Sequence, residues 1–147
     1  MIRSLWRISD YANLNGTGGL NASGRWHIIG RPVVYAAESP AGALTELLVH
    51  MDPQFADEEF QLLEIEVPSG IAMKSAGHLQ PDWRDNLDVT RKIGDDWLTG
   101  METALLRVPS AIVPDTYNVL INPLHRDAAK IRIAAKKKLR LDPRLRK

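Results

Sequence analysis

The sequence predicts an α+β domain, and two observations favour this class. Short apolar runs bounded by Gly, Pro, Asn and Asp recur along the chain, which is typical of strands. Two or three helical segments are expected among these runs, the clearest beginning with a serine followed by a proline at residues 39–40. Short strands mixed with a few helices are typical of α+β folds, and a chain of 147 residues is most simply one domain, spanning residues 1–147.

The expected strands follow the apolar runs. Pro109 divides one apolar stretch into two runs, and the last two runs of the chain would close the sheet. Residues 71–82 give no clear signal, and residues 10–32 are expected to be irregular because glycine and asparagine are frequent there. The runs lie at residues 4–9, 33–37, 60–67, 104–108, 110–113, 118–121, 131–134 and 139–141.

One helix is well defined by the residues at its ends. Ser39 is expected to cap its N-terminus, with Pro40 as its first residue, and the helix should run to about Met51 and be ended by Asp52-Pro53. Glu46 lies outside the apolar stripe of this helix, so its carboxylate faces either solvent or a cleft, and the pattern alone favours solvent. The stripe consists of Ala43, Leu44, Leu47, Leu48 and Met51.

Two other segments have weaker helical patterns. Residues 83–98 are expected to be helical in part, with an interruption at Gly94 because glycine is a poor helix former. Residues 127–130 are expected to form one helical turn. No internal repeat or low-complexity segment accompanies these elements.

The composition excludes some classes of site. The chain has no cysteine, so disulfides and thiolate metal sites are ruled out. The first residues lack the apolar core of a signal peptide, and no apolar run approaches the ~20 residues that cross a membrane. We therefore expect a cytoplasmic protein that does not enter the membrane.

Charge is distributed unevenly along the chain. Residues 130–147 contain nine basic residues and one acidic residue, a net charge of +8, whereas residues 1–129 carry a net charge of −7. A basic end of this kind could bind nucleic acid, but it lacks the interleaved aromatic residues that stack on single strands. A solvated basic strand is the favoured interpretation, and a nucleic-acid-binding module remains an alternative.

The stretch from residue 16 to residue 50 combines a glycine-rich loop with the helix that begins at Pro40. It is not a dinucleotide fingerprint, because no strand–GxGxxG–helix context surrounds it, and it lacks the GK[ST] of a P-loop. A loop of this length inside a compact domain is uncommon unless it is functional. The alternative is a surface loop without a ligand.

Individual polar residues are ambiguous when they are taken one at a time. Arg7, in the first strand, either extends to solvent or binds an anion in a cleft. Tyr35 could be a core aromatic residue, and Ser110 a turn residue after Pro109. The histidines lack the spacing of a metal site, so no metal is expected, and no serine occupies the GxSxG context of a hydrolase.

Three segments together resemble the RES domain. They are GTGGLNASGRWHIIGRPVVYAAESPAGALTELLVH at 16–50, PSAIVPDTYNVLINPLH at 109–125 and LRLDPRL at 139–145. The resemblance extends from WRI at 6–8 to DPRL at 142–145. It implies a fold similar to ADP-ribosyltransferases, a split mixed β-sheet with a few flanking helices.

The same resemblance implies cleavage of NAD, as substrate, at the nicotinamide–ribose bond. Carried over position by position, the family's arginine, tyrosine, glutamate and serine are Arg25, Tyr35, Glu46 and Ser110, and Arg7 matches a further arginine. Glu46 would face the positive charge that develops on the ribose, while Arg25 and Arg7 would hold the pyrophosphate. Tyr35 would offer its ring to the nicotinamide or ribose, and Ser110 would hydrogen-bond the nicotinamide amide or a ribose hydroxyl.

The resemblance also implies a biological setting, the toxin component of a RES–Xre toxin–antitoxin pair. The partner would be an Xre-type antitoxin with a helix-turn-helix, so that DNA is contacted only indirectly, and a dimer of toxin–antitoxin units is compatible with it. Family members pass ADP-ribose to water, to phosphate or to a protein side chain. An NAD-depleting toxin is therefore the leading expectation, and a protein mono-ADP-ribosyltransferase is the alternative.

Overall fold

The computed structural model describes residues 3–52, 54 and 59–146. Its helices are α1 (Thr17–Asn21), α2 (Pro40–His50) and α3 (Leu87–Gly100), with 3-10 turns η2 (Trp83–Asp85), η3 (Arg126–Lys130) and η4 (Pro143–Arg146). Its strands are β1 (Arg3–Ser9), β2 (Val34–Ala37), β3 (Glu59–Val67), β4 (Met73–Ser75), β5 (Leu105–Pro109), β6 (Tyr117–Ile121) and β7 (Arg132–Arg140). The expected α+β class is confirmed.

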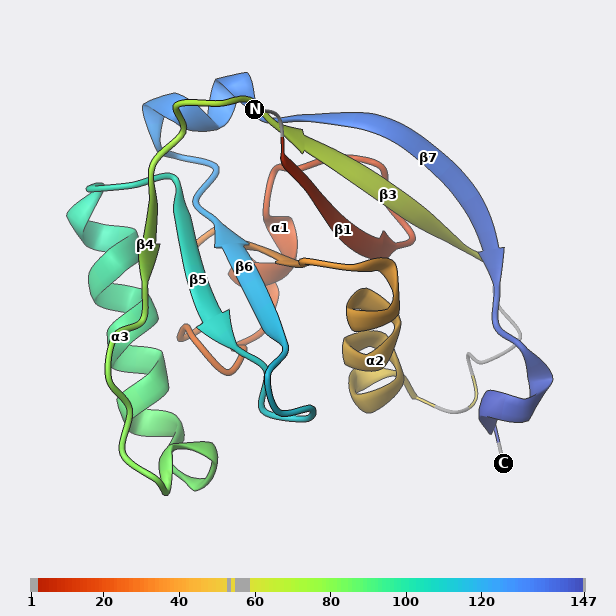
Figure 1. Cartoon of the computed structure of the whole chain (residues 1–147), viewed down its shortest axis with the longest axis horizontal. Helices are drawn as coiled ribbons and strands as arrows, with labels where there is room; N and C mark the ends of the chain where they lie inside the picture. Colours follow the sequence, from red (N-terminus) through yellow and green to blue (C-terminus); the bar gives the residue numbers. More distant parts are fainter. Residues whose placement is uncertain (1–2, 53, 55–58, 147) are drawn as a thin grey trace.

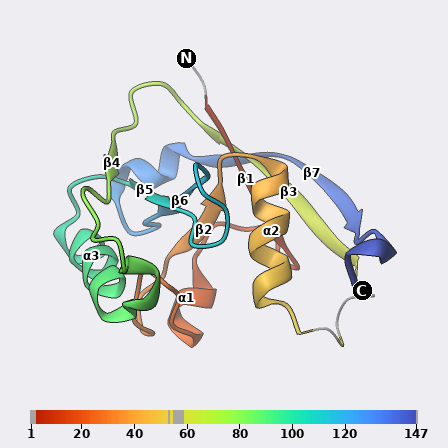
Figure 2. The same ribbon diagram turned by 60° about the horizontal axis from the view of Figure 1, so that its bottom comes forward.

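These strands form one seven-stranded mixed sheet in the described part of the chain, in the order β4-β5-β6-β2-β1-β3-β7. All neighbours are antiparallel except the parallel pair β4 and β5. Figure 1 shows β4, β5 and β6 on one side of the molecule and β1, β3 and β7 on the other. Figure 2 shows the three α-helices on one side of the strands.

The sheet is split at its centre, between β1 and β2. Within the described residues, these two strands share the single register pair Trp6↔Ala37, whereas β1 pairs with β3 from Arg3 to Ser9. Beyond Trp6 the two halves of the sheet diverge, and α2 lies beside the gap (Figure 1). This divergence opens the space in which the candidate site lies.

The core has two parts, one for each side of the sheet. One cluster is formed by side chains of β1, β2, β3, β5 and β6, such as Leu5 and Ile65, which are fully buried. The other joins Leu106, Val108 and Leu120 to three tryptophans. The tryptophans are Trp26, Trp83 and Trp97. The second cluster holds α3 and the loop around residue 26 against β5 and β6.

The helix signals at residues 39–51 are confirmed. The Ser39 hydroxyl accepts a hydrogen bond from the Gly42 N–H at 2.9 Å, and Pro40 is the first helical residue. The helix ends at His50, and Met51 is its C-cap. Pro53, which was expected to end the helix with Asp52, lies outside the described residues.

Three other expectations about elements, the irregular stretch 10–32, the strand at 110–113 and the interruption at Gly94, were wrong. The glycine-rich loop contains the short helix α1, and the stretch 71–82, which gave no clear signal, contains β4. The apolar run at 110–113 is a turn, because the Ser110 N–H donates to the Thr116 carbonyl at 2.8 Å and closes the β5–β6 connection. Helix α3 begins at Leu87 and passes through Gly94 without interruption.

The basic C-terminal stretch forms one continuous strand, β7, where two separate runs were expected. Among the described strands it pairs only with β3 and lies at the edge of the sheet, so most of its side chains face solvent and need not be apolar. Lysines on an exposed edge strand oppose pairing with other chains. Two basic side chains also pair with carboxylates of β3, Arg132 with Glu66 and Lys138 with Glu59.

No helix in residues 3–52, 54 and 59–146 is both long enough and apolar enough to cross a lipid bilayer.

Candidate functional site

A cavity of about 500 Å³ lies where the sheet splits. It is lined by side chains from β1, β2, α2, the glycine-rich loop and the β5–β6 connection. Four of the five site residues expected from the resemblance line it, namely Arg7, Arg25, Tyr35 and Glu46. Arg25, from the glycine-rich loop, and Glu46, from α2, thus line the same cavity.

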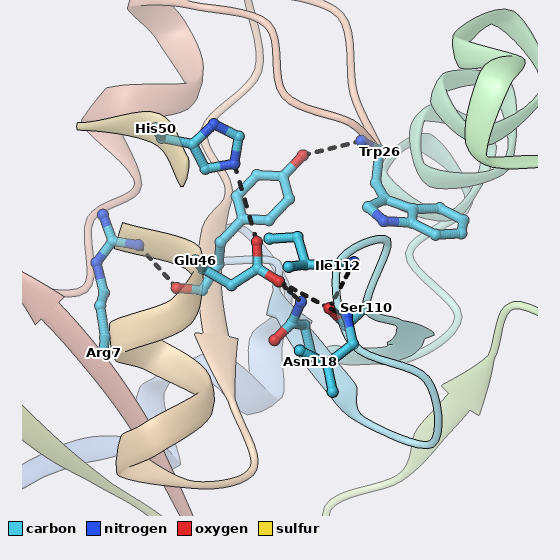
Figure 3. Close-up of polar contacts among 9 residues, drawn as sticks. Arg7, Trp26, Glu46, His50, Ser110, Ile112 and Asn118 are labelled. Carbon is cyan, nitrogen blue, oxygen red and sulfur yellow. Dashed lines mark hydrogen bonds and ion pairs between the residues drawn. The ribbon is translucent and has the colours of Figure 1, made fainter. Parts of the chain in front are cut away.

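Glu46 points into this cavity from α2, although the helical pattern alone favoured solvent. Its Oε1 accepts hydrogen bonds from Asn118 Nδ2 at 2.8 Å and from Ser110 Oγ at 3.1 Å. Its Oε2 is 3.9 Å from His50 Nε2, and the Glu46 side chain is 29% exposed. One oxygen is therefore fixed by the protein, while the carboxylate remains accessible from the cavity (Figure 3).

Ser110 lies behind Glu46 rather than on the cavity wall. It is buried, with 2% of its surface exposed, and it is absent from the cavity lining. Its oxygen accepts the N–H groups of Ile112 and Val113 at 3.1 and 3.3 Å, so the hydroxyl proton goes to Glu46. In this arrangement Ser110 orients Glu46, which differs from the expected direct contact with nicotinamide or ribose.

Asn118, on β6, is a site residue that the sequence reasoning missed. It lines the cavity, and its amide nitrogen donates to Glu46. Its Oδ1 is buried without a hydrogen-bond partner in the described structure, which costs free energy. The side-chain amide is thus oriented so that its nitrogen donates to Glu46, although this leaves its oxygen without a partner. The available signal was a polar residue at the start of the apolar run 118–121.

Tyr35 connects β2 to the glycine-rich loop through its hydroxyl. The Trp26 N–H donates to that oxygen at 3.2 Å, so the hydroxyl proton goes to His27 Nδ1 at 2.7 Å. His27 then carries its proton on Nε2 and donates to the Gly19 carbonyl at 3.2 Å. Burial raises the pKa of Tyr35, so the phenol stays protonated and keeps this direction of donation.

The loop that carries Arg25 is held by α3. Thr90 Oγ1 donates to the Arg25 carbonyl at 2.7 Å, and Arg91 Nε donates to the Gly24 carbonyl at 2.9 Å. A Cβ atom at Gly94 would overlap the carbonyl oxygen of Trp26, so only glycine permits this close approach. The glycine expected to interrupt the helix instead lets the helix pack on the loop.

The Arg25 guanidinium lies against residues 83–84. Its Nη1 donates to the Arg84 carbonyl at 3.0 Å, and its Cζ is 5.9 Å from the centre of the Trp83 ring. Arg84 also lies over that ring, with its Cζ at 4.8 Å. Two cations therefore gather around one tryptophan, which attracts cations through its ring face.

Arg7 bridges the gap between β1 and β2. Its Nη1 donates to the Tyr35 carbonyl at 2.7 Å, which leaves further N–H groups of the guanidinium for a ligand. Burial lowers the pKa of the Arg7 guanidinium from its ordinary value. Figure 3 shows Arg7 and Trp26 on opposite sides of Glu46.

The cavity is therefore lined by one oriented carboxylate, by two arginine residues and by apolar side chains such as Val49 and Ile112. Such a site can bind an anionic group through the arginines and stabilise a developing positive charge through the carboxylate. Among the residues that the structure describes, no three histidine, aspartate or glutamate side chains gather as metal ligands would.

Comparisons with known proteins show the family to which the chain belongs. The RES domain family model matches residues 4–142. The chain is 50% identical to the protein named Toxin Res of Pseudomonas putida, over 88% of this chain and 90% of that one. It is 37% identical to the Prs ADP-ribosylating toxin of a Sphingobium species, over 99% of this chain and 98% of that one.

The fold is also that of a solved structure, the Mycobacterium tuberculosis MbcT–MbcA toxin–antitoxin complex. A chain of that complex matches 95% of this chain with a TM-score of 0.77, over 85% of its own length, at 14% identity. This likeness supports the fold, and the curated relatives support the family. The two curated relatives are both named as toxins. The chain therefore belongs to the RES domain family.

Proposed function

We propose that this protein is a toxin that depletes NAD by cleaving its nicotinamide–ribose bond. The observation that carries the proposal is the carboxylate of Glu46, which two donors hold in a cavity that also contains Arg7 and Arg25. A small apolar cavity with a few convergent charged groups is the usual form of a ligand site. The family and its toxin relatives are consistent with this activity.

The reaction suits a site with one carboxylate. Breaking the bond between nicotinamide and ribose leaves an oxocarbenium-like sugar, and the nicotinamide ring leaves without needing a proton because it is already cationic. A pair of carboxylates, as in glycosidases of neutral substrates, is therefore unnecessary. Glu46 would face the cationic sugar, and its interaction strengthens as the charge develops.

The other groups would bind and orient the substrate. Arg7 and Arg25 offer charge-assisted hydrogen bonds to the pyrophosphate. The Tyr35 ring lines the cavity and offers a flat face to the nicotinamide or ribose, while its hydroxyl stays bound to His27. Ser110 and Asn118 would act by fixing the carboxylate.

Transfer of ADP-ribose to a protein is the second candidate, and one observation favours it. A relative at 37% identity that spans nearly the whole chain is named as an ADP-ribosylating toxin. Water, phosphate and a protein side chain would all attack the same carbon. With NAD labelled in its adenylate half, free labelled ADP-ribose or its phosphorylated form supports depletion, and labelled protein supports transfer.

A protein antitoxin would restrain this activity. The solved complex of similar fold pairs a toxin with an antitoxin, and the resemblance implies an Xre-type partner with a helix-turn-helix for this chain. DNA would then be contacted through the partner, and pairs could assemble as dimers. The toxic activity would be exerted in the cytoplasm, where NAD is available.

Expression without a partner tests the proposed function. Growth and cellular NAD should fall together when the unaltered chain is induced, and both should be preserved with Glu46→Gln at equal protein level. Glu102→Gln, an exposed carboxylate outside the cavity, is the matched control and should behave like the unaltered chain. Growth arrest with unchanged NAD would contradict depletion.

A further inference from the structure

Three cavities meet at Arg7. The first is the 500 Å³ cavity around Glu46, and the second is a smaller space of about 210 Å³ beside α2. The third, of about 610 Å³, lies between β1 and the residues that follow it up to Asn21. Arg7 lines all three, Gly18 lines the first and third, and Leu47 lines the second and third.

We infer that the third cavity is the adenosine subsite for NAD. This inference rests on the proposed function and states where the half of the dinucleotide remote from the reaction would bind. A dinucleotide carries its negative charge in the middle, between two nucleoside ends that are flat and largely apolar. Arg7, a cation shared by adjoining cavities, matches that distribution of charge, with the pyrophosphate beside it.

The split of the sheet explains why these spaces share Arg7 as a lining residue. After the single register pair Trp6↔Ala37, β1 continues without β2 beside it, so residues 7–9 border open space. The Arg7 guanidinium crosses this gap to the Tyr35 carbonyl at 2.7 Å. Because Arg7 lines both the first and the third cavity, a ligand that occupies both can contact its guanidinium.

The lining of the third cavity suits a purine nucleoside. Its apolar lining includes Ile8, Val34 and Phe60. Its polar lining offers amide and hydroxyl groups to a base edge and to ribose hydroxyls. These groups belong to Ser9, Asn13, Asn15, Thr17 and Asn21. Asn13, Asn15 and Ser9 each accept a hydrogen bond within the loop, which leaves the amide N–H groups of the asparagines for a ligand.

Tyr11 is the aromatic side chain available to stack on the base. It lines the third cavity and is 73% exposed, although its ring is large and apolar. Its backbone is held by a hydrogen bond from its N–H to Ser9 Oγ at 3.1 Å, which keeps the residue beside the end of β1. Stacking of a base on such a ring adds affinity without requiring a particular base.

Equilibrium binding of ADP tests the subsite without relying on turnover. ADP contains the adenosine and pyrophosphate but no nicotinamide, and the Glu46→Gln protein serves as the starting variant, measured by titration calorimetry. ADP should bind it, and adding Tyr11→Ala should weaken ADP binding by about tenfold or more. Tyr11→Trp should preserve binding because it keeps an aromatic face.

Two controls separate the subsite from general effects. Nicotinamide mononucleotide lacks the adenosine, so Tyr11→Ala should leave its binding unchanged. Leu124→Ala removes another exposed apolar side chain, 65% exposed, that lines none of the three cavities, and it should leave ADP binding unchanged.

The outcomes distinguish this inference from the proposed function. Failure of ADP to bind, or an equal effect of Tyr11→Ala on ADP and on the mononucleotide, would overturn the adenosine subsite. So would unchanged ADP binding in Tyr11→Ala. Cleavage of NAD by the unaltered chain would stand in each of these cases, because it depends on Glu46 and is measured separately.

Discussion

Glu46 is useful for chemistry because its neighbours determine its orientation. Ser110 and Asn118 both donate to Oε1, and each comes from a segment whose position the sheet fixes, the end of β5 and the start of β6. A carboxylate held in this way does not have to reorganise when positive charge appears on a substrate. Its orienting partners should therefore affect the rate more than the binding of substrate.

Replacing Asn118 by leucine tests this role. The substitution keeps the approximate size of the side chain and removes the 2.8 Å hydrogen bond to Glu46. The kcat for nicotinamide release should fall by about tenfold to a hundredfold, because a small misplacement of a catalytic group is costly, while KM changes little. A normal kcat in steady-state assays of the folded variant would remove Asn118 from the site.

Replacing Arg7 by methionine separates binding from stability. The KM for NAD should rise by about tenfold or more, because a charged hydrogen bond to the pyrophosphate is lost. Burial lowers the pKa of Arg7, which means that burying its charge costs free energy of folding. Methionine avoids this cost, and the gain offsets the stability lost with the hydrogen bond to the Tyr35 carbonyl. The free energy of unfolding should therefore change by no more than about 2 kcal/mol in urea denaturation.

Arg140→Met is the control for that experiment. Arg140 lies on the exposed edge strand β7 and lines none of the three cavities. It should leave KM unchanged. An equal rise in KM for both variants would attribute the effect to net charge rather than to a contact with substrate.

The sequence pointed to some of the residues of the candidate site and could not point to others. The resemblance pointed to Arg7, Arg25, Tyr35 and Glu46, and all four line one cavity. Asn118 was missed because its role depends on β6 lying opposite α2, which no local pattern encodes. Ser110 was expected at the substrate, but its burial behind Glu46 depends on how the turn at 110–113 folds.

Helix α3 lies away from the Glu46 carboxylate but supports the candidate site, because it holds the loop that carries Arg25. Thr90 and Arg91 bind backbone carbonyls of the loop, and Gly94 lets the two backbones meet. Asp95 accepts the Ile28 N–H at 3.2 Å from the same face of the helix. Changes in α3 should therefore reach the cavity through the loop.

Gly94→Ala tests the contact between α3 and the loop. Alanine is the better helix former, yet the added Cβ would overlap the Trp26 carbonyl, so the variant should be destabilised by about 1–3 kcal/mol. Its kcat/KM for NAD should also fall, since Arg25 moves with the loop. Urea denaturation and steady-state kinetics measure the two effects.

Gly100→Ala is the matched control within the same helix. A Cβ at Gly100 would meet nothing within 4 Å, so this variant should be as stable as the unaltered chain or slightly more so. Similar losses in both variants would argue against a special contact at Gly94.

Elements with local end signals were predictable, and elements that depend on pairing were not. The start of α2 is marked by two adjacent residues, the cap Ser39 and the first helical residue Pro40, so its expected start was correct. Strand β7 was expected as two pieces because its middle is polar, and only its place at the edge of the sheet permits that composition. Strand β4 is three residues long and pairs in parallel with β5, a long-range contact that leaves little local pattern.

At the scale of the whole molecule, the candidate site depends on a sheet that is not continuous. The single register pair between β1 and β2 lets the two halves separate, and the cavities occupy the resulting gap. The α+β class could be predicted from the pattern of short strands and few helices. The split itself entered only through the family resemblance, because register is a property of strand pairs rather than of either strand alone.

Release of nicotinamide from NAD by the purified chain is the most direct test of the central claim. The unaltered protein and Glu102→Gln should release nicotinamide at the same rate, and Glu46→Gln, with an unchanged free energy of unfolding, should be slower by about a thousandfold or more. Equal release by the unaltered chain and Glu46→Gln would contradict the account, as would an absence of nicotinamide with all three proteins.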